Sequence, residues 1–477
     1  MKLKMVVAGV CLALLSGCQT QQAEEMPLEE PVFKNVSVHD PSIIKDSEGE
    51  YFIIGSHMQA AKSSDLIQWQ QISADVTTTK LFEDIHEEFK DEFAYAQTGT
   101  FWAGDVIQLK DGKYYMYYCL CRGDSPLSVL GVAVADQVDG PYKKVESFLY
   151  SGTSPQFGKT YDATKDPNAI DPHVFYGHDE KLWMVYGSYS GGIYILELDD
   201  TTGLPKDRTS YGKKLMGGNH SRIEAPYITY NPETKYYYLF VTFGGLDSQG
   251  GYNMRVSRSK NADGPYEDIS GQEMIQAKGK VNSFFDDPSI EKYGNKLMGN
   301  FIYKLDEPLT NKGYVSPGHN SVYYDEAKNE YYLVFHTRFP NRGEGYGVRV
   351  HQMYFTESGW PVVSPLRYAG ETFKNLVKKE IAGNYKLIQT TKKVSKEVSL
   401  PELIELKRNG KIEGTYIGKW QLAKKSEEDS KVTINESDYF GKFIYMWDET
   451  QKKQVMSFTG VNDEGLPIYL IEEISED

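Results

Sequence analysis

Three acidic residues occupy similar places in the sequence and could together perform acid–base catalysis. Asp40 (in VHDPSI), Asp171 (in AIDPHV) and Glu224 (in RIEAPY) each open a segment of apolar and aromatic residues, and each is followed by Pro or Ala-Pro. Proline restricts the residue before it, so we expect extended backbone at these positions. Hydrolysis of a glycosidic bond with inversion requires such a set: one carboxylate that activates water and one carboxylic acid that protonates the leaving oxygen.

Close packing of these acids would create the two protonation states that such chemistry needs. Burial and repulsion between like charges raise the pKa of at least one carboxyl group, which can then act as a general acid near neutral pH. The alternative is that each Asp-Pro pair only caps a turn, as Asp often does. Three acids at equivalent positions of a repeat favour catalysis.

A repeated hairpin pattern must position these acids. Each copy has a polar or acidic first residue, a short apolar run, a turn and an aromatic return strand. The copies are DPSIIKDSEGEYFIIGS (40–56), GDVIQLKDGKYYMYYCL (104–120), DPHVFYGHDEKLWMVYGS (171–188), EAPYITYNPETKYYYLFVTFG (224–244) and HNSVYYDEAKNEYYLVFHTR (319–338). Such self-similarity predicts an all-β, five-bladed β-propeller whose inner strands point their first residues at a common axis.

The domain boundaries follow from changes in sequence texture. We assign residues 32–379 to the propeller and residues 380–477, which are rich in Lys and Glu and lack the aromatic repeat, to a small C-terminal β-barrel or sandwich. Two Asp-Gly-Pro-Tyr segments, 139–142 and 263–266, indicate equivalent outer hairpins of two blades.

Composition excludes some classes of function. The chain has 36 Tyr and 43 Gly, typical of aromatic strands joined by tight turns, and a net charge of −15 without a block of Lys or Arg. Nucleic acid is therefore not expected as a partner. Cys119 and Cys121 lie on a predicted strand. We expect their side chains on opposite faces and no disulfide framework.

The N-terminal residues predict export and a lipid anchor. Lys2 and Lys4 precede an apolar run from Met5 to Leu15 that is too short to span a bilayer. We read residues 1–17 as a signal peptide. The ending Leu-Ser-Gly before Cys18 resembles a bacterial lipobox, which implies lipidation of Cys18. The polar residues 18–31 then form a tether, and the protein is expected in the bacterial cell envelope, at the outer membrane or cell surface.

Six motifs in order give the chain a family resemblance. They are VHDPSI (38–43), FWAGDV (101–106), NAIDPHVF (168–175), SRIEAPY (221–227), KLMGNF (296–301) and PGHNSV (317–322). The chain resembles glycoside hydrolase family 43, and within it the two-domain endo-α-1,5-L-arabinanases. The resemblance implies a monomer that acts on arabinan or arabino-oligosaccharides, with Asp40 as general base, Glu224 as general acid and Asp171 tuning the pKa of that acid.

The same resemblance implies a metal site and a sugar subsite. It makes His319 the protein ligand of a largely water-coordinated Ca²⁺ in the propeller channel, although a lone His is more often an ordinary core residue. Trp102 is the candidate for stacking on a sugar ring, or else it is part of the blade core. The residues expected around the furanose ring are Trp102, Gly123, Asn168, Ile170, Ser188 and Ser190.

Three alternatives remain open from the sequence. Asp287 in DDPSI echoes the segment that carries Asp40, but it precedes a motif that the family uses structurally. An exo-acting arabinofuranosidase or β-xylosidase of the same fold would differ only in loops that block one end of the groove. A surface glycan-binding lipoprotein would keep the propeller without needing all three acids.

Overall fold

The computed structural model of the chain describes residues 30–152, 156–309 and 312–474. The predicted signal peptide, Cys18 and all but the last residues of the predicted tether lie outside the described residues. The described residues from Pro31 onward form one compact unit. Among the described residues, no helix is both long and apolar enough to cross a membrane.

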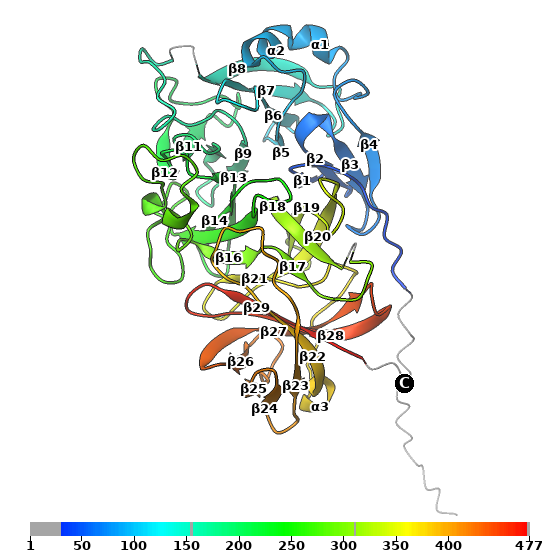
Figure 1. Cartoon of the computed structure of the whole chain (residues 1–477). Helices are drawn as coiled ribbons and strands as arrows, with labels where there is room; N and C mark the ends of the chain where they lie inside the picture. The colour runs from blue at the N-terminus through cyan, green and yellow to red at the C-terminus, as the bar shows by residue number, and fades with distance from the viewer. Residues whose placement is uncertain (1–29, 153–155, 310–311, 475–477) are drawn as a thin grey trace, which may run out of the picture. The chain divides into compact units, whose positions relative to one another are not determined.

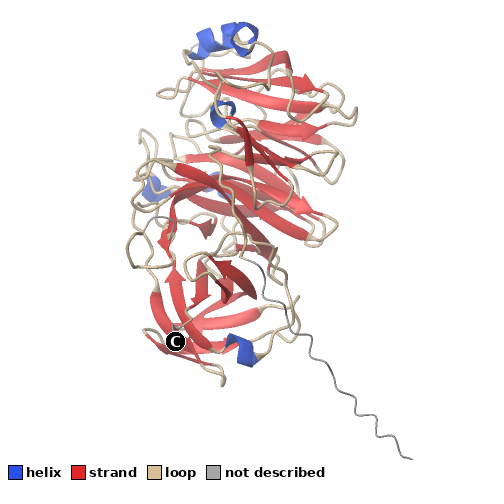
Figure 2. Cartoon of the chain, turned by 90° about the vertical axis from the view of Figure 1, so that its right-hand side faces the viewer, coloured by secondary structure: helices blue, strands red, loops and turns tan. Residues whose placement is uncertain are grey.

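Strands dominate the described chain, and they form five open sheets and one closed barrel (Figures 1 and 2). The first two sheets contain β1 (Ser42–Lys45), β2 (Tyr51–Ile54), β3 (Ala60–Ser63), β4 (Gln70–Ser73), β5 (Asp105–Gln108), β6 (Tyr114–Cys121), β7 (Ser128–Ala135) and β8 (Lys143–Ser151). The next two contain β9 (His173–Tyr176), β10 (Leu182–Tyr186), β11 (Ile193–Leu198), β12 (Lys213–Met216), β13 (Ile223–Asn231), β14 (Tyr236–Phe243), β15 (Asn253–Ser259) and β16 (Asn295–Met298). The fifth contains β17 (Phe301–Ile302), β18 (Gly313–Asp325), β19 (Glu330–Arg338), β20 (Tyr346–Phe355) and β21 (Pro361–Val363).

The inner strands of the five sheets form a ring. Strand β1 contacts β5 and β18, β5 contacts β9, β9 contacts β13, and β13 contacts β18, and Figure 1 shows their labels around one centre. Each of these strands is the first strand of one of the five predicted hairpins. The fifth blade has one additional short strand, β17, which precedes β18. The predicted all-β, five-bladed propeller is therefore confirmed.

Side chains of the inner strands bond neighbouring blades to one another. Asp105 accepts hydrogen bonds from the Ser42 hydroxyl of the first blade and from the Val174 backbone of the third, at 2.7 Å for the latter. Tyr227 donates to the Val322 carbonyl at 3.1 Å and joins the fourth blade to the fifth. The FWAGDV motif thus contributes an acid that ties three blades together.

The ring closes between the first and fifth blades. The N–H of Val348 in β20 donates to the carbonyl of Val36 at 3.1 Å. Val36 and Val38 are buried in a core cluster that combines first-blade residues with fifth-blade residues such as Tyr332 and Val350. The residues just before β1 therefore seal the propeller by apolar burial.

The two Asp-Gly-Pro-Tyr segments form equivalent turns. Tyr142 follows the third strand of the second blade and donates its hydroxyl to the Val138 carbonyl at 2.7 Å. Tyr266 follows the third strand of the fourth blade and donates to the Ala262 carbonyl at the same distance. Both tyrosines are buried, so each fixes the turn after the third strand. In the second blade β8 follows directly, whereas in the fourth blade β16 begins only at Asn295, so the predicted equivalence holds for the turn and not for the outer hairpin.

Our expectation for the two cysteines was wrong. Cys119 and Cys121 are two residues apart in β6, and residues two apart in a strand project from the same face. Both are free and pack in one core cluster between the second and third blades. They behave as small apolar residues.

Helices are few and short among the described residues. They are α1 (Ile85–Glu88), α2 (Lys90–Ala96), α3 (Lys378–Ile381) and the 3₁₀ turns η1 (Ser56–Met58), η2 (Met274–Gln276) and η3 (Asp287–Ser289). The Asp84 carboxylate accepts the Glu87 N–H at 3.1 Å and caps α1. Helix α2 packs on β6 and β7 of the second blade.

The C-terminal strands close into a barrel of eight, which settles the predicted barrel or sandwich as a barrel. They are β22 (Gly383–Gln389), β23 (Glu402–Leu406), β24 (Lys411–Gly414), β25 (Gly418–Gln421), β26 (Ser430–Ile434), β27 (Ser437–Asp448), β28 (Lys453–Val461) and β29 (Pro467–Glu472), with β22 paired to β29. Large apolar side chains, including Trp420, Phe443 and Phe458, fill its core. The Tyr469 hydroxyl donates to the Leu297 carbonyl at 2.5 Å, joining the barrel to the fourth blade.

Candidate active site

Asp40, Asp171, Glu224 and His319 come together at the centre of the propeller. Asp40 and Asp171 directly precede the Pro residues before β1 and β9, while Glu224 and His319 lie in β13 and β18. The three acids are only 7%, 5% and 7% exposed, in chain order. Each of the three has a pKa that responds to the charge of His319, so the four groups form one electrostatic cluster.

Unusual backbone angles direct these side chains. Asp40 has φ 57°, Asp171 has 55°, His319 has 47°, and Ala225, next to Glu224, has 56°. Residues other than Gly rarely adopt these angles, and such strain is concentrated at functional sites. Our prediction of extended backbone before the two prolines was therefore wrong. Short acidic side chains tolerate the left-handed region better than most, and the surrounding hydrogen bonds hold them there.

Asp40 is surrounded by donors. Its Oδ2 lies 2.7 Å from His39 Nδ1 and accepts the Ser56 hydroxyl at 2.5 Å, while its Oδ1 lies 3.0 Å from His319 Nδ1. Its backbone N–H donates to His336 Nδ1 at 3.2 Å. Burial alone would raise the pKa of Asp40, but the charges and hydrogen bonds of His319 and His39 outweigh it and hold this pKa well below its usual value. Asp40 is therefore ionised across the neutral range.

Glu224, unlike Asp40, has a raised pKa. Its two oxygens accept hydrogen bonds from the Ser188 hydroxyl at 2.7 Å and the Tyr252 hydroxyl at 2.8 Å. Burial raises the pKa of Glu224, and the negative charge of Asp40 adds to this, while both hydroxyls and His319 pull it down by a smaller amount. Glu224 thus favours its protonated form more than an exposed glutamate does.

Asp171 lies beside the other two acids. Its Oδ2 accepts the Ala225 N–H at 3.2 Å, which fixes the backbone that carries Glu224. Burial raises the pKa of Asp171 to about 8; the charges of Glu224 and Asp40 act in the same direction, and His319 opposes them. Its protonation is therefore coupled to that of Glu224.

His319 supplies positive charge to this cluster. Burial would lower its pKa, but the charges of Asp40 and Asp171 raise it to about 9. Buried carboxylates require such a compensating cation. Nearby, both polar atoms of the Asn320 side chain and Nε2 of His336 are buried without a hydrogen-bond partner in the described structure.

These donors fit a hydrated Ca²⁺ better than an ion held directly by many side chains. His39, Asp40 and His336 offer ligand atoms within 4.8 Å of one another. However, the His39 and His336 rings stack at 4.0 Å, and two imidazoles suit transition metals more than calcium. A water-coordinated ion near His319 would instead give partners to the unsatisfied atoms of Asn320 and His336.

Two of the predicted sugar-binding residues contact each other. Trp102 is half-buried, and its backbone N–H donates to the Cys119 carbonyl at 2.9 Å. Gly123 has φ 93°, and a Cβ placed on it would lie 3.2 Å from the Trp102 ring. At this positive φ, a larger residue would strain the backbone and crowd the indole.

The other predicted subsite residues are more buried. Asn168 uses its side-chain oxygen to accept the Ser128 and Ser151 hydroxyls at 2.5 and 3.2 Å, which ties it to the second blade. Ile170 is a core residue. Ser190 is buried at φ 33° and accepts the His220 N–H through its carbonyl. Among the described residues of the predicted set, Ser188 is the one that hydrogen-bonds to one of the three acids.

Asp287 lies outside the cluster of acids. It begins η3, and its carboxylate pairs with the Arg222 guanidinium, with Nε at 3.0 Å from Oδ1. This pair fixes the loop that carries Phe284 and Phe285 beside Arg222.

Sequence reasoning missed several residues that contact the acids. Ser56, like the predicted Ser188, ends a hairpin copy in a Gly-Ser pair, so the repeat itself contained that signal. His336 and Tyr252 gave no comparable signal, because only the closed ring brings them to Asp40 and Glu224. His39 is the sequence neighbour of Asp40 in the VHDPSI motif.

The comparisons with known proteins agree with this architecture. Residues 29–361 match the family described as Glycosyl hydrolases family 43, and residues 365–470 match a C-terminal lipocalin-like domain. The chain belongs to glycosyl hydrolase family 43. An extracellular endo-α-(1→5)-L-arabinanase 2 from Bacillus subtilis is 52% identical over 444 residues, which cover 92% of this family 43 chain and 94% of the relative.

Relatives with solved structures share the fold over nearly the whole chain. The family 43 YxiA protein from Bacillus licheniformis is 50% identical with a TM-score of 0.89, covering 93% of this chain and 100% of that one. An endo-1,5-α-L-arabinanase from Thermotoga petrophila is 44% identical with a TM-score of 0.88 and the same coverage. Both domains of this family 43 chain thus have counterparts of similar arrangement.

Proposed function

We propose that this chain is an endo-1,5-α-L-arabinanase that hydrolyses internal linkages of arabinan with inversion. The observation that carries the proposal is the pair of opposite protonation preferences in one buried cluster: the pKa of Asp40 is held low and that of Glu224 is raised. Inverting hydrolysis needs one ionised and one protonated carboxyl group. Relatives 52% and 45% identical over more than nine-tenths of this chain carry the endo-arabinanase name.

Each acid then has a defined task. Asp40 accepts a proton from water, and the resulting hydroxide equivalent attacks the anomeric carbon from the face opposite the leaving sugar. Glu224 donates its proton to the glycosidic oxygen as the bond to carbon breaks. Asp171 accepts the Ala225 N–H next to Glu224, and its protonation is coupled to that of Glu224. Ser56 and Ser188 orient the two catalytic carboxyl groups.

The two rival functions have less support. An exo-α-(1→5)-L-arabinofuranosidase from Cellvibrio japonicus is a relative, but it is 26% identical and covers 69% of this chain. A glycan-binding protein without turnover would have no need for three buried acids and their dedicated hydroxyl donors. The endo-acting hydrolase therefore accounts for more of the molecule.

A calcium ion at His319 belongs to the proposal. The imidazole would hold the ion through Nε2 in its neutral form, with the Nδ1 proton kept toward Asp40 and water completing the shell. The ion would then supply, in place of protonated His319, the positive charge beside the three acids. Metal analysis of the purified protein should give about one calcium per chain, and His319→Gln should abolish it. Retention of calcium by that variant would remove His319 as the ligand.

Secretion is supported by the extracellular names of the relatives. The finer proposal is a monomer anchored in the cell envelope through lipid on Cys18. Mass spectrometry of the N-terminal peptide from cells should show a diacylated Cys18, and Cys18→Ser should release the protein to the medium. Sedimentation of the soluble form should give the mass of one chain.

The decisive experiment follows product sizes and anomers on linear arabinan. The soluble form lacking residues 1–18 should release mixed oligosaccharides early, with inverted configuration by NMR, and Glu224→Gln should be nearly inactive. Arabinose alone as the early product would establish the exo rival. Binding of the polymer without any cleavage would establish the glycan-binding rival.

A further inference from the structure

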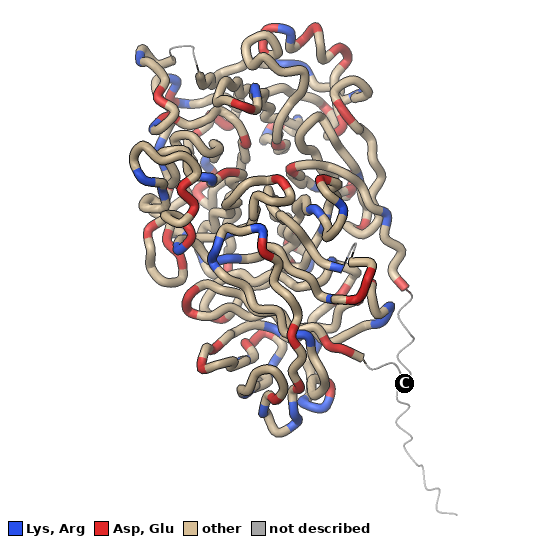
Figure 3. The backbone as a smooth tube through the Cα atoms, viewed as in Figure 1, with Lys and Arg blue, Asp and Glu red and all other residues tan. Residues whose placement is uncertain are grey.

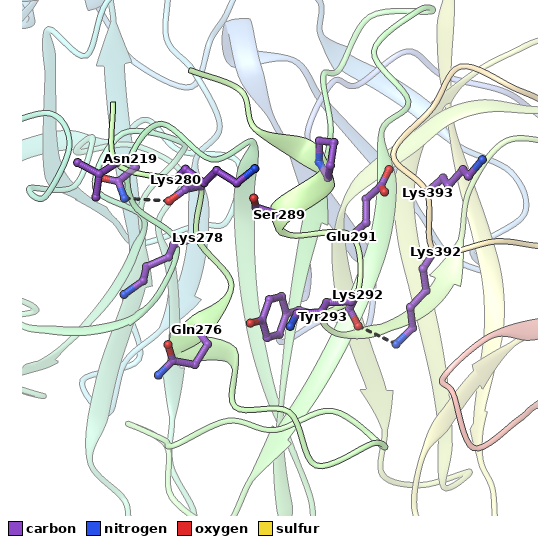
Figure 4. Close-up of a pocket in the computed structure, with 13 residues that line it drawn as sticks. Asn219, Gln276, Lys278, Lys280, Ser289, Glu291, Lys292, Tyr293, Lys392 and Lys393 are labelled. Atoms are coloured by element: carbon purple, nitrogen blue, oxygen red, sulfur yellow. Dashed lines mark hydrogen bonds between the residues drawn. The ribbon is translucent and has the colours of Figure 1, made fainter. Parts of the chain in front are cut away.

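A hollow of about 840 Å³ lies beside the segment 276–293, away from the three acids (Figure 4). Lysine ammonium groups stand on both sides of it in the close-up, from the segment 278–292 and from the neighbouring residues 392–393. Its lining includes one carboxylate, Glu291, and five lysines: Lys278, Lys280, Lys292, Lys392 and Lys393. We call this hollow the lysine pocket.

The lysines of the pocket differ from most others in the described structure. Acidic and basic residues are interspersed along the chain (Figure 3), and lysines such as Lys110, Lys143 and Lys206 lie within 2.7 Å of a carboxylate. Within the described ranges, no ion pair joins any of the five pocket lysines to an acid. The Lys392 ammonium instead donates to the Lys292 carbonyl at 2.9 Å. The whole chain has a net charge of −15, so these unpaired lysines form a local region of positive charge on an acidic protein.

Buried cations behind the pocket add to its positive potential. Arg255 is fully buried, and its guanidinium donates to the Asn253 side-chain oxygen and to the carbonyls of Glu291 and Tyr293. Lys296 donates to the Thr391 carbonyl at 2.8 Å, but burial lowers its pKa to about 7, so Lys296 is only partly charged at neutral pH. The hydrogen-bond acceptors of both groups are neutral, although the charges of Glu291 and Asp268 favour the cation of Arg255.

The cations of this region act on one another. Lys214 is half-buried beside Lys278; burial, and then the charge of Lys278, lower its pKa to about 8. Burial lowers the pKa of Lys392; the charge of Asp268 opposes this, and the charge of Arg255 adds to it. Repulsion of this kind is relieved when an anion binds, so the pocket is electrostatically suited to one.

The loop that forms one wall of the pocket also contacts a residue beside Glu224. Phe285 contacts the Tyr189 ring, with centroids 5.5 Å apart, and the Arg222 guanidinium stacks on Phe285 at 5.7 Å. Tyr189 is close enough to Glu224 that the charge of Glu224, after burial, raises its pKa. Phe284 is 67% exposed and packs its ring against Phe285, with centroids 4.2 Å apart. The segment 278–289 thus carries both pocket-lining residues and an aromatic residue that contacts Tyr189, a neighbour of Glu224.

The chemistry of the pocket does not match arabinan itself. Arabinan is a neutral polymer of hydroxyl groups, so it offers ammonium groups no charged partner. The lysines are spread around a space large enough for several sugar units, which suits charges spaced along a chain better than a single compact anion. Lysine acts as a point charge for such groups.

We propose that the lysine pocket binds the carboxylates of an acidic polysaccharide that is joined to the arabinan, such as a polyuronate. The inference rests on the proposed arabinanase function. The pocket gives the enzyme a preference for arabinan still linked to that chain over free arabinan, by raising the association rate and lowering KM. The catalytic residues and kcat on neutral substrate are not involved.

The test compares two triple variants of the full soluble chain. Lys278→Gln, Lys280→Gln and Lys393→Gln remove three pocket charges, and the control Lys411→Gln, Lys419→Gln and Lys425→Gln removes three exposed charges from the barrel. The pocket variant should lose about ten-fold in kcat/KM on arabinan linked to a polyuronate while changing by less than about two-fold on linear arabinan. The control should change neither. Calorimetry should show an oligomer of α-1,4-linked galacturonic acid binding to the parent and not to the pocket variant.

Several results would overturn the proposal. An equal loss on both substrates, or the same loss in the control, would make the effect general. Absence of oligouronate binding to the parent would remove the ligand, and so would equal binding of dextran sulfate, which would show ion exchange. Binding of vesicles that contain phosphatidylglycerol, without binding of oligouronate, would assign the pocket to a membrane. If the parent failed to cut linear arabinan while still binding oligouronate, the proposed function would fail and the binding site would stand.

Discussion

The centre of the propeller and the interior of the barrel bury different kinds of side chain. At the propeller centre, buried acids and imidazoles are held by hydrogen bonds and left-handed backbone, and some polar atoms remain unsatisfied. The barrel interior is filled with apolar side chains such as Trp420, Phe443 and Phe458. An eight-stranded barrel can be filled this way or can enclose a small ligand. The difference indicates that the polar groups at the propeller centre serve chemistry at a cost in stability, whereas the apolar interior of the barrel contributes stability.

The largest effect should come from neutralising the catalytic acid. Glu224→Gln should lower kcat on linear arabinan by about 10³-fold or more, because an amide has no proton to deliver to the leaving oxygen. The melting temperature should stay unchanged or rise, since a buried carboxyl group is replaced by a neutral one. Initial rates of reducing-sugar release and thermal unfolding measure the two effects.

A buried acid of the barrel gives the matched control. Asp448 is fully buried and accepts the Thr450 N–H at 2.8 Å and the Gln451 side chain at 2.8 Å. Asp448→Asn should cost about 1–3 kcal/mol of unfolding free energy and leave kcat unchanged. If Asp448→Asn reduced kcat as much as Glu224→Gln, the contrast between the two regions would be wrong.

Removing an aromatic ring from the barrel should act on stability alone. Phe458→Ala should lower the free energy of unfolding by about 3–5 kcal/mol, because the cavity it leaves cannot collapse fully. Urea unfolding measures this loss, and kcat/KM below the transition should match the parent. Phe440→Ala is the control: that ring is 43% exposed, so its loss should cost less than about 1 kcal/mol. A drop in kcat/KM of folded Phe458→Ala would show that the barrel shapes the site.

A smaller change is expected when a donor to the acid is removed. The Ser188 hydroxyl stabilises ionised Glu224, so Ser188→Ala should raise the pKa of Glu224. Because Glu224 acts in its protonated form, the alkaline limb of the kcat/KM profile should move to higher pH. The value of kcat/KM should fall about ten-fold, because the lost hydrogen bond no longer stabilises the carboxylate that forms when Glu224 gives up its proton. Ser151→Ala, which removes a buried hydroxyl bonded to Asn168, should leave the alkaline limb in place. An unmoved limb in Ser188→Ala would contradict the assignment of Glu224 as the acid.

The smallest effect concerns Glu371, between the propeller and the barrel. Burial raises its pKa to about 8, above the value in the unfolded chain, so the folded state retains a proton that the unfolded state loses. Stability should therefore fall as pH rises from about 4.5 to about 8. Glu371→Gln should flatten this fall and raise the melting temperature at pH 8 by roughly 1–3 °C. Parallel pH curves for both proteins would contradict a buried, protonated Glu371.

The sequence predicted the propeller because its evidence is local. A period of hairpins can be read along the chain, and so can the first residues Asp40, Asp171, Glu224 and His319. The left-handed backbone at Asp40 and Asp171 could not be predicted in this way, since proline argued for the opposite. Hydrogen bonds from distant blades, as from His319 to Asp40, outweigh that local preference.

By itself, the sequence determined the class of fold, the acids that could do chemistry and the family to which they belong. Those properties depend on residue type and periodicity, which are present in the linear chain. The tertiary structure alone decided which acid is held ionised and which is held protonated. It also gathered lysines from the segment 278–292 and from residues 392–393 around one pocket. The reason is that pKa and electrostatic potential depend on distances between groups far apart in sequence, and only the closed ring and the docked barrel set those distances.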